Sequence, residues 1–197
     1  MTPPIRRLLA SAFVVLFFAG CTTSTGPASV GKTSGQASDV AGDGGTADLT
    51  FVLFEVAGRT ATVVANFDPA TYQGDSVVAT FDLDVDENPA TGFASTDPGY
   101  VGLGVDYQLV IGNVDPTTGK IAARIKKYQG GTFTFVQDLP IAVNSGGFVA
   151  SISYDFFGDT DDLLAFRVES NRVNGDGTLS ARQDWAPDAG AAPVTVR

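Results

Sequence analysis

Three aspartates alternate with apolar residues in one short stretch near the middle of the chain, FDLDVDENPATGF at residues 81 to 93. On a strand, Asp82, Asp84 and Asp86 share one face, while the apolar side chains face a core on the other. Like charges at two-residue spacing repel one another across such a face. They are stable together when they stay in water or when a cation lies among them.

Calcium is the cation best suited to these oxygen ligands. It takes six to eight oxygens at about 2.3–2.6 Å, whereas strand residues two apart are separated by about 6.5–7 Å. The strand therefore has to curl near Val85, so that Asp84, Asp86, Asn88 and a loop carbonyl surround one point. The proline and glycine after Asn88 supply turn chemistry for that curl. The sequence predicts a calcium loop at the end of this strand.

The acidic stretch has two other interpretations, an EF-hand loop and a solvated strand edge. The spacing of the first three candidate ligands is that of an EF-hand loop, but Pro89 stands at its glycine position and Ser95 at its bidentate glutamate position. We therefore reject an EF-hand. The remaining alternative to a calcium loop is a solvated acidic strand edge that discourages aggregation.

The residues alone also leave open whether Asp106 reaches the acidic loop or is simply exposed.

Missing residue types exclude several classes of chemistry. The chain has no histidine, its only cysteine is Cys21 and its only methionine is Met1. Zinc fingers, Ser-His-Asp triads and haem held by histidine or methionine are therefore excluded. We expect neither zinc nor haem, which leaves carboxylates, hydroxyls, lysine, arginine or a hard metal.

The chain is acidic. Its formal net charge is −10, from 12 Lys and Arg against 22 Asp and Glu, and without Arg6 and Arg7 of the N-terminal segment it becomes (12 − 2) − 22 = −12. An acidic surface argues against nucleic acid as a partner. The basic residues Arg124, Lys126 and Lys127 are interpreted as a solvated face rather than an anion site.

Residues 1–20 have the pattern of a bacterial signal peptide. Arg6 and Arg7 precede a short apolar run, residues 8 to 18, and small residues stand before Cys21. The segment FAGC resembles the lipobox of bacterial lipoproteins, which implies that Cys21 is lipidated and anchors the protein to a membrane without a spanning helix. The next residue is not aspartate, which favours the outer membrane. The alternative is an ordinary signal peptide cut nearby, which leaves a free thiol.

Residues 21–47 are predicted to hold the lipidated cysteine and a flexible linker. Small and polar residues dominate this segment, so it buries too little apolar surface to offset the entropy lost on ordering. Residues 26 to 33, GPASVGKT, have the spacing of a P-loop. Neither a preceding strand nor a following helix is predicted, so this match is interpreted as chance.

Residues 48–197 are predicted to form one all-β domain. Apolar residues alternate in nine segments that are separated by turn signals. These segments are residues 49–57, 60–67, 77–85, 104–112, 121–128 and 132–136, one around Ile141, and residues 148–154 and 164–168. The pattern predicts an antiparallel β-sandwich, jelly-roll-like, of about eight or nine strands, with a barrel as the alternative.

The order of these features resembles the sandwich shared by DOMON-type domains and family-nine carbohydrate-binding modules. The resemblance covers most of residues 48 to 190. It is carried by the segments VVATFDLDVDENPATGF, GVDYQLVIG, IKKYQGGTFTFV, LLAFRVES and DWAPDAG. It implies a jelly-roll-like sandwich with a structural calcium, used for binding rather than catalysis. The ligands it implies are Asp84, Asp86 and Asn88, with Asp82 and Asp106 as further candidates.

Two aromatic residues are candidates for contact with a sugar. Trp185 and Tyr100 are considered because aromatic faces pack on the apolar faces of sugar rings. The alternatives are that Trp185 anchors the C-terminal segment to the sandwich and that Tyr100 covers the edge of the core.

These observations together predict a non-catalytic lipoprotein of the bacterial cell envelope with a calcium-stabilised β-sandwich that binds extracellular glycan. One alternative is an envelope structural or assembly lipoprotein that binds another protein. The other is a glycan-active enzyme that uses two carboxylates, although no particular pair stands out in the sequence.

Overall fold

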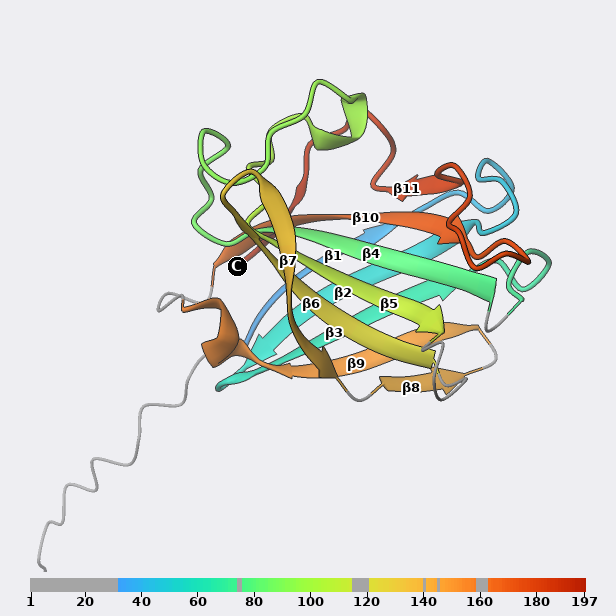
Figure 1. The fold of residues 1–197 in the computed structure, drawn as a ribbon, viewed down its shortest axis with the longest axis horizontal. Helices are drawn as coiled ribbons and strands as arrows, with labels where there is room; N and C mark the ends of the chain where they lie inside the picture. The colour runs from blue at the N-terminus through green and yellow to red at the C-terminus, as the bar shows by residue number, and fades with distance from the viewer. Residues whose placement is uncertain (1–31, 74–75, 115–120, 140, 145, 159–162) are drawn as a thin grey trace, which may run out of the picture.

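Alternating apolar residues form the strands of this computed structural model, which describes residues 32–73, 76–114, 121–139, 141–144, 146–158 and 163–197 (Figure 1). The strands in these ranges are β1 (Thr33–Ser38), β2 (Leu49–Ala57), β3 (Thr60–Phe67), β4 (Val77–Asp84), β5 (Tyr107–Val114), β6 (Ile121–Gln129), β7 (Thr132–Leu139), β8 (Ile141–Asn144), β9 (Gly147–Ser153), β10 (Leu164–Arg172), β11 (Asp184–Ala186) and β12 (Val194–Val196). Within the same ranges, short 3₁₀ helices lie at Pro98–Tyr100 and Tyr154–Phe157. The predicted signal peptide at residues 1–20, Cys21 and linker residues 22–31 lie outside the described residues.

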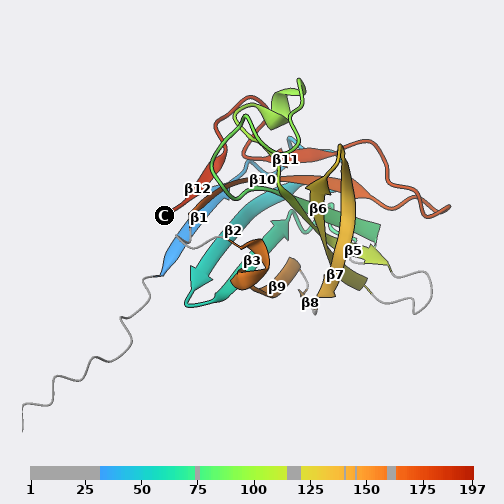
Figure 2. The same cartoon turned by 60° about the vertical axis from the view of Figure 1, so that its left-hand side comes forward.

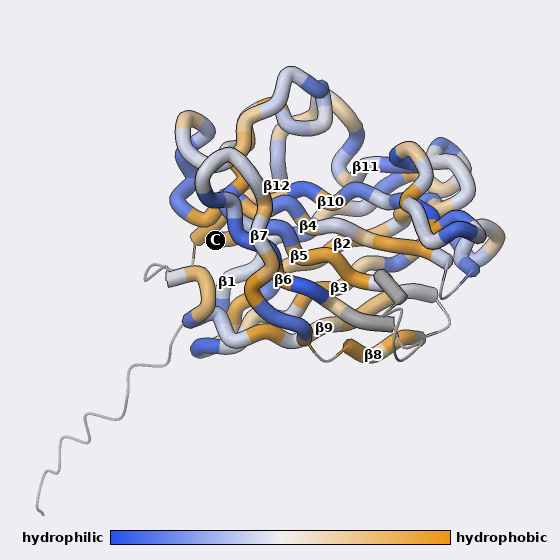
Figure 3. The backbone as a smooth tube through the Cα atoms, in the orientation of Figure 1, coloured by the Kyte–Doolittle hydropathy of each residue, from blue (hydrophilic) through white to orange (hydrophobic). Residues whose placement is uncertain are grey.

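The strands form two antiparallel sheets that pack face to face (Figure 1, Figure 2). One sheet has the order β1-β2-β3-β9-β8, and the other has the order β11-β10-β4-β5-β6-β7, with β12 paired to β10. Figure 3 shows apolar stretches on strands of both sheets, such as β2 and β5. Buried phenylalanines fill the space between the sheets, namely Phe54, Phe67, Phe81, Phe148 and Phe166. The predicted antiparallel β-sandwich is confirmed.

Strand β1 corrects the predicted boundary of the folded domain. Residues Thr33–Ser38 lie inside the predicted linker, yet they pair in antiparallel register with residues 51 to 56 of β2 along their whole length. The Ser34 amide also donates to the Arg197 carbonyl at 3.1 Å, which ties β1 to the end of the chain. The polar sequence does not prevent this, because backbone hydrogen bonds rather than an apolar face hold an edge strand. A P-loop at residues 26 to 33 would require a helix directly after it. The structure has strand β1 there instead.

Removal of β1 tests this corrected boundary. A chain that begins at Val40 is expected to have a free energy of unfolding about 2–3 kcal/mol below that of a chain that begins at Lys32, because the hydrogen bonds of the β1–β2 ladder are lost. Urea unfolding followed by circular dichroism measures this difference. Equal midpoints in the two chains would show that β1 adds nothing to the fold.

The outer face of the seven-stranded sheet is covered by the loop after β4 and by the C-terminal segment. Figure 1 shows the green loop above β4 and β10, beside the red segment that contains β11. The apolar residues of this cover, Tyr100, Leu103, Val105 and Trp185, form one cluster with Ala165 of β10. Asp82 and Asp84 on β4 are therefore buried instead of facing water.

Among the described residues, no helix has both the length and the apolar character that crossing a bilayer requires.

Candidate metal centre

The acidic stretch leaves the sheet at the end of β4. Asp84 is the last residue of the strand and is 1% exposed. Its Oδ1 accepts a hydrogen bond from the Asn88 amide at 3.0 Å, and its Oδ2 accepts one from the Gly104 amide at 2.9 Å. Glu87 has φ of 48°, in the left-handed region, which reverses the chain between these contacts. The strand curls just after Val85, as the calcium geometry required.

Three carboxylates converge at this curl. Asp84, Asp86 and Asp106 each place one oxygen within 4.8 Å of the other two. Two ligands of one calcium ion lie at most about 5 Å apart, given bonds of about 2.3–2.6 Å. Asp106 comes from the segment before β5, and its Oδ2 accepts from the Val85 amide at 3.0 Å. Asp106 thus reaches the acidic loop, which decides between its two predicted placements.

The electrostatics of the group favour a cation. Burial raises the pKa of Asp84, and its neighbours Asp106 and Asp86 raise it further against the opposing effect of the Gly104 and Asn88 amides. Burial also raises the pKa of Asp106, together with the charge of Asp86. Two of the three carboxylates are therefore costly to ionise in the absence of a positive charge, and an ion among them would remove that cost.

The structure places two predicted ligands differently. The Asn88 amide donates to both Asp84 and Asp86, but its side-chain Oδ1 accepts from the Ala90 amide at 3.1 Å and so closes a turn within the loop. Asp82 lies one pleat back on β4, too far along the strand to join the group. Its Oδ1 accepts from Gln108 Nε2 at 2.8 Å instead.

Asp82 is a fully buried carboxylate with an incomplete set of partners. Its Oδ2 has no hydrogen-bond partner among the described residues. Burial raises the pKa of Asp82 well above its ordinary value, and the nearby charge of Glu169 raises it further, whereas Gln108, Arg182 and Tyr100 act in the opposite direction. The side chain therefore favours the protonated form in the folded state.

Replacement of Asp82 by asparagine is expected to stabilise the protein at high pH. A raised pKa in the folded state means that the free energy of unfolding falls as pH rises from the unfolded pKa, about 3.9, through the folded pKa. Asparagine keeps an acceptor for Gln108 and carries no charge. Asp82→Asn should gain about 1–2 kcal/mol near pH 8. Near pH 3.5, where the carboxyl is mostly protonated in both states, the gain should be small.

Urea unfolding of both proteins at the two pH values measures the effect. A loss of stability at high pH in Asp82→Asn would mean that the ionised carboxylate is favoured in the folded protein.

Trp185 and Tyr100 are packed against each other instead of being open to a sugar. They are 7% and 9% exposed, and their ring centroids lie 5.4 Å apart in an edge-to-face arrangement. The Arg182 guanidinium lies 3.9 Å from the centroid of the Trp185 ring. A Cβ atom on Gly99 would lie 1.9 Å from that ring, so the loop closes tightly over it. The structure supports the alternative role of Trp185 as an anchor of the C-terminal segment.

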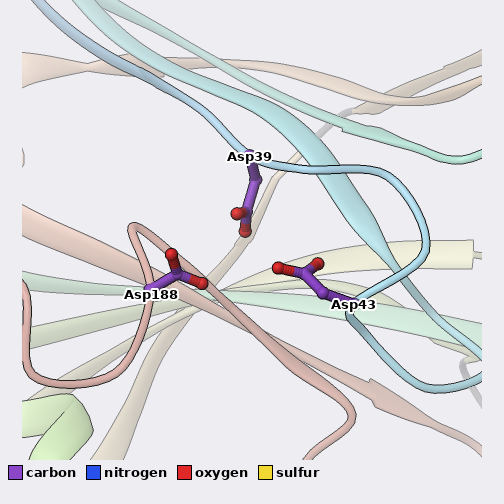
Figure 4. A group of neighbouring side chains, drawn as sticks. All are labelled: Asp39, Asp43 and Asp188. Atoms are coloured by element: carbon purple, nitrogen blue, oxygen red, sulfur yellow. The ribbon is translucent and has the colours of Figure 1, made fainter.

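A second set of carboxylates was not found by sequence reasoning. Asp39, Asp43 and Asp188 point toward one another (Figure 4), with one oxygen of each within 4.8 Å of the others. Asp43 meets the same criterion with Asp48 and Asp184. Asp39 and Asp43 come from the predicted linker, Asp48 is the first residue of the predicted domain, and Asp184 and Asp188 lie in the C-terminal segment. Only their proximity in the fold identifies them as a group.

Two carboxylates of this second set, Asp48 and Asp184, already accept hydrogen bonds from backbone amides. Asp48 accepts from the Gly42 and Gly44 amides at 2.6 and 2.7 Å, and Asp184 accepts from the Leu49 and Trp185 amides at 2.7 and 2.8 Å. These contacts tie the segment before β2 to β11. Burial is the main cause that raises the pKa of Asp184 to about 7 and that of Asp39 to about 6. The main role of this group is therefore structural: its hydrogen bonds hold the segment before β2 and the C-terminal segment together.

Comparisons with known proteins add no relative. No family model matches the chain, and no curated protein or solved structure matches it.

Proposed function

We propose that the chain is a non-catalytic cell-envelope lipoprotein whose β-sandwich is stabilised by calcium and binds extracellular glycan. The observation that carries this proposal is the convergence of Asp84, Asp86 and Asp106 within 4.8 Å at the end of β4. Calcium is held by Asp84 and Asp106 from the frame of the sheet and by Asp86 from the loop. The ion fixes a loop whose carboxylates otherwise repel one another.

The burial of Asp84 favours this proposal over a solvated acidic edge. A solvated edge requires carboxylates in contact with water, yet Asp84 is almost fully buried beneath the loop. Its pKa is raised by burial, which indicates a charge that water does not stabilise well. A hard cation such as calcium, which prefers oxygen ligands, supplies the missing stabilisation.

The proposed location of the protein rests on the N-terminal motif. Lipidation of Cys21 anchors the protein to the bacterial membrane, with the outer membrane as the favoured address. Since β1 begins at Thr33, residues 22 to 32 separate the anchor from the sandwich. These eleven residues span at most about 36–40 Å when extended, so the sandwich stays close to the bilayer.

A second candidate function is assembly with another envelope protein. Strand β7 is an edge of its sheet, and on it Phe135 is 60% exposed beside the exposed Val136. An open strand edge with apolar side chains is a surface that a partner strand can extend. This feature favours a protein partner as the alternative to glycan.

Thermal unfolding with and without calcium tests the proposal. Calcium in hundredfold excess over its dissociation constant adds about 2.7 kcal/mol, which corresponds to a rise in Tm of about 5–10 °C for a chain of this size. The purified full chain should show this rise over the same protein in chelator. The double variant Asp86→Asn/Asp106→Asn should show none.

The matched control replaces two aspartates elsewhere. Asp138 and Asp155 form ion pairs with Arg124 and Arg59 and belong to neither group of converging carboxylates. Asp138→Asn/Asp155→Asn should keep the full calcium-dependent rise. A wild-type protein whose Tm is the same in calcium and in chelator would refute the proposal.

A further inference from the structure

Strand β7 ends the seven-stranded sheet and pairs only with β6 among the described strands. It has eight residues. The other edge strands in the described ranges are shorter or joined to another segment: β8 has four residues, β11 has three, and β1 is joined to the chain end by the hydrogen bond from Ser34 to Arg197. Strand β7 is therefore the longest open edge in the part of the chain that the structure describes.

The side chains of β7 lack the features that protect natural sheet edges. Its sequence, TFTFVQDL, has no lysine and no proline, and its one charged residue, Asp138, is already paired with Arg124 at 3.0 Å. In the middle of the strand, Phe135 and Val136 are 60% and 40% exposed. Charges and prolines on an edge stop further strands from pairing, whereas aromatic and β-branched residues favour strand pairing. The edge is thus suited to accept another strand.

A β-bulge in β7 restricts which strand fits this edge. Phe135 and Gln137 are opposite consecutive residues of β6, so Val136 between them has no partner there. A regular strand fits β7 on only one side of Val136, because the alternation of side chains shifts by one residue at that point. A strand that fits along the whole edge needs a bulge of its own at the matching position, and a second copy of β7 has one.

Antiparallel pairing of two β7 strands over all eight residues places the two bulges side by side. In this register, Phe135 of one copy is opposite Val136 of the other, and Thr134 is opposite Gln137. Thr134 and Gln137 share one face of the sheet, since their partners on β6 are two residues apart. Asp138 is opposite an uncharged aromatic residue, so no like charges meet across the pair. The edge is therefore complementary to itself in side-chain direction and in charge.

We infer that β7 pairs with β7 of a second copy of this chain, which joins the two seven-stranded sheets into one. Such an interface uses the same strand on both copies, across a twofold axis. Because each β7 edge is occupied by the other copy, the assembly closes at two copies. The inference goes beyond the proposed function and depends on neither calcium nor glycan. It commits to a second copy as the occupant of the edge, in place of a different envelope protein.

The length of the strand limits the strength of this dimer. One ladder of eight residues is a small interface beside the roughly 1,200–2,000 Å² that stable protein complexes bury. We therefore expect a reversible dimer with a dissociation constant on the order of tens of micromolar.

Sedimentation velocity of the purified full chain between about 1 and 500 μM tests the inference. The wild type should change from monomer to dimer across this range. Phe135→Lys/Val136→Lys should raise the dissociation constant by about tenfold or more, because lysines on an edge oppose pairing. Both side chains are exposed, so the variant should keep the wild-type circular dichroism spectrum.

The matched control adds the same charge at two exposed apolar residues outside β7. Val101 and Leu179 are 55% and 50% exposed. Val101→Lys/Leu179→Lys should dimerise as the wild type does. An equal loss of dimer in this variant would show that added charge, and not the β7 edge, controls association, and would overturn the inference.

Hydrogen exchange at the two ends of the concentration range locates the contact. Amides of β7 should exchange more slowly in the dimer, because pairing protects them from water. A monomer at all concentrations would overturn the inference and leave the edge to a different chain. A dimer whose β7 amides exchange as in the monomer, or one that persists unchanged in Phe135→Lys/Val136→Lys, would place the contact elsewhere and would also overturn it.

Discussion

Replacement of Arg167 by alanine is expected to lower the free energy of unfolding by about 3–5 kcal/mol. Arg167 lies on β10 and is fully buried. Its guanidinium donates to the Asp188 carbonyl at 3.2 Å and to the Ala191 carbonyl, and it lies 5.6 Å from the Trp185 ring centroid. Alanine leaves both carbonyls unpaired and removes the packing that holds the C-terminal segment on the sheet.

Arg167 is also coupled to Asp82 at high pH. When Asp82 ionises, its negative charge stabilises the buried Arg167 guanidinium. At high pH the loss in Arg167→Ala should therefore be smaller in the background of Asp82→Asn, and a double-mutant cycle measures that coupling. At low pH, where Asp82 is protonated, the coupling should disappear.

Urea unfolding followed by Trp185 fluorescence measures the loss, because Trp185 is the only tryptophan and lies in the released segment. Arg124→Ala is the matched control, since Arg124 makes a surface ion pair with Asp138 at 3.0 Å. Such pairs contribute about 0–1 kcal/mol. Equal losses in the two variants would show that Arg167 does not hold the segment.

Replacement of Gly104 by alanine is expected to cost about 3 kcal/mol and to abolish the calcium-dependent rise in Tm. A Cβ atom at this position would lie 2.2 Å from the Thr91 carbonyl oxygen and 2.5 Å from that of Asn88. Both contacts are with backbone atoms of the acidic loop, which cannot rotate away. The loop must move outward, and the Gly104 amide then loses its hydrogen bond to Asp84.

Gly175→Ala is the matched control for this substitution. A Cβ atom on Gly175 meets no atom within 4 Å, and its backbone is not left-handed. We expect its stability and its calcium response to equal those of the wild type, measured by thermal melts in calcium and in chelator. An unchanged calcium response in Gly104→Ala would show that calcium binding does not require the close packing of the acidic loop against Gly104.

The sandwich was predictable because its main strands alternate strictly. In β6, for example, Ala123 and Ile125 are buried while Arg124 and Lys126 are partly exposed, as the period of two requires. Strands β1, β11 and β12 were not predictable in this way. Two of them have three residues each, and β1 is a polar strand that backbone pairing holds at a sheet edge.

The candidate metal site was predictable only in part. Asp84 and Asp86 follow from the strand period and the turn after it, and Asp106 was a candidate whose side the sequence did not fix. Asp82 shares their strand face but not their point of convergence, because one pleat of the strand separates it from Asp84. The group around Asp43 had no local signal, since it forms only when the N-terminal and C-terminal segments meet in the fold.

The burial of the aromatic candidates could not be read from the sequence either. Trp185 and Tyr100 lie in turn-rich segments that resemble open loops. They are buried because each segment folds onto the other over the outer face of the sheet. A cavity lined by Asp86, Tyr107 and Lys127 is likewise formed by segments that are distant in sequence.

Direct titration of the full chain with calcium tests the central claim most sharply. Isothermal titration calorimetry should show calcium binding in the wild type, its loss in Asp86→Asn/Asp106→Asn, and its retention in Asp39→Asn/Asp43→Asn, which alters the second set of carboxylates. Calcium binding that survives in the first variant and disappears in the second would move the ion to the second set. No binding in the wild type would contradict the account entirely.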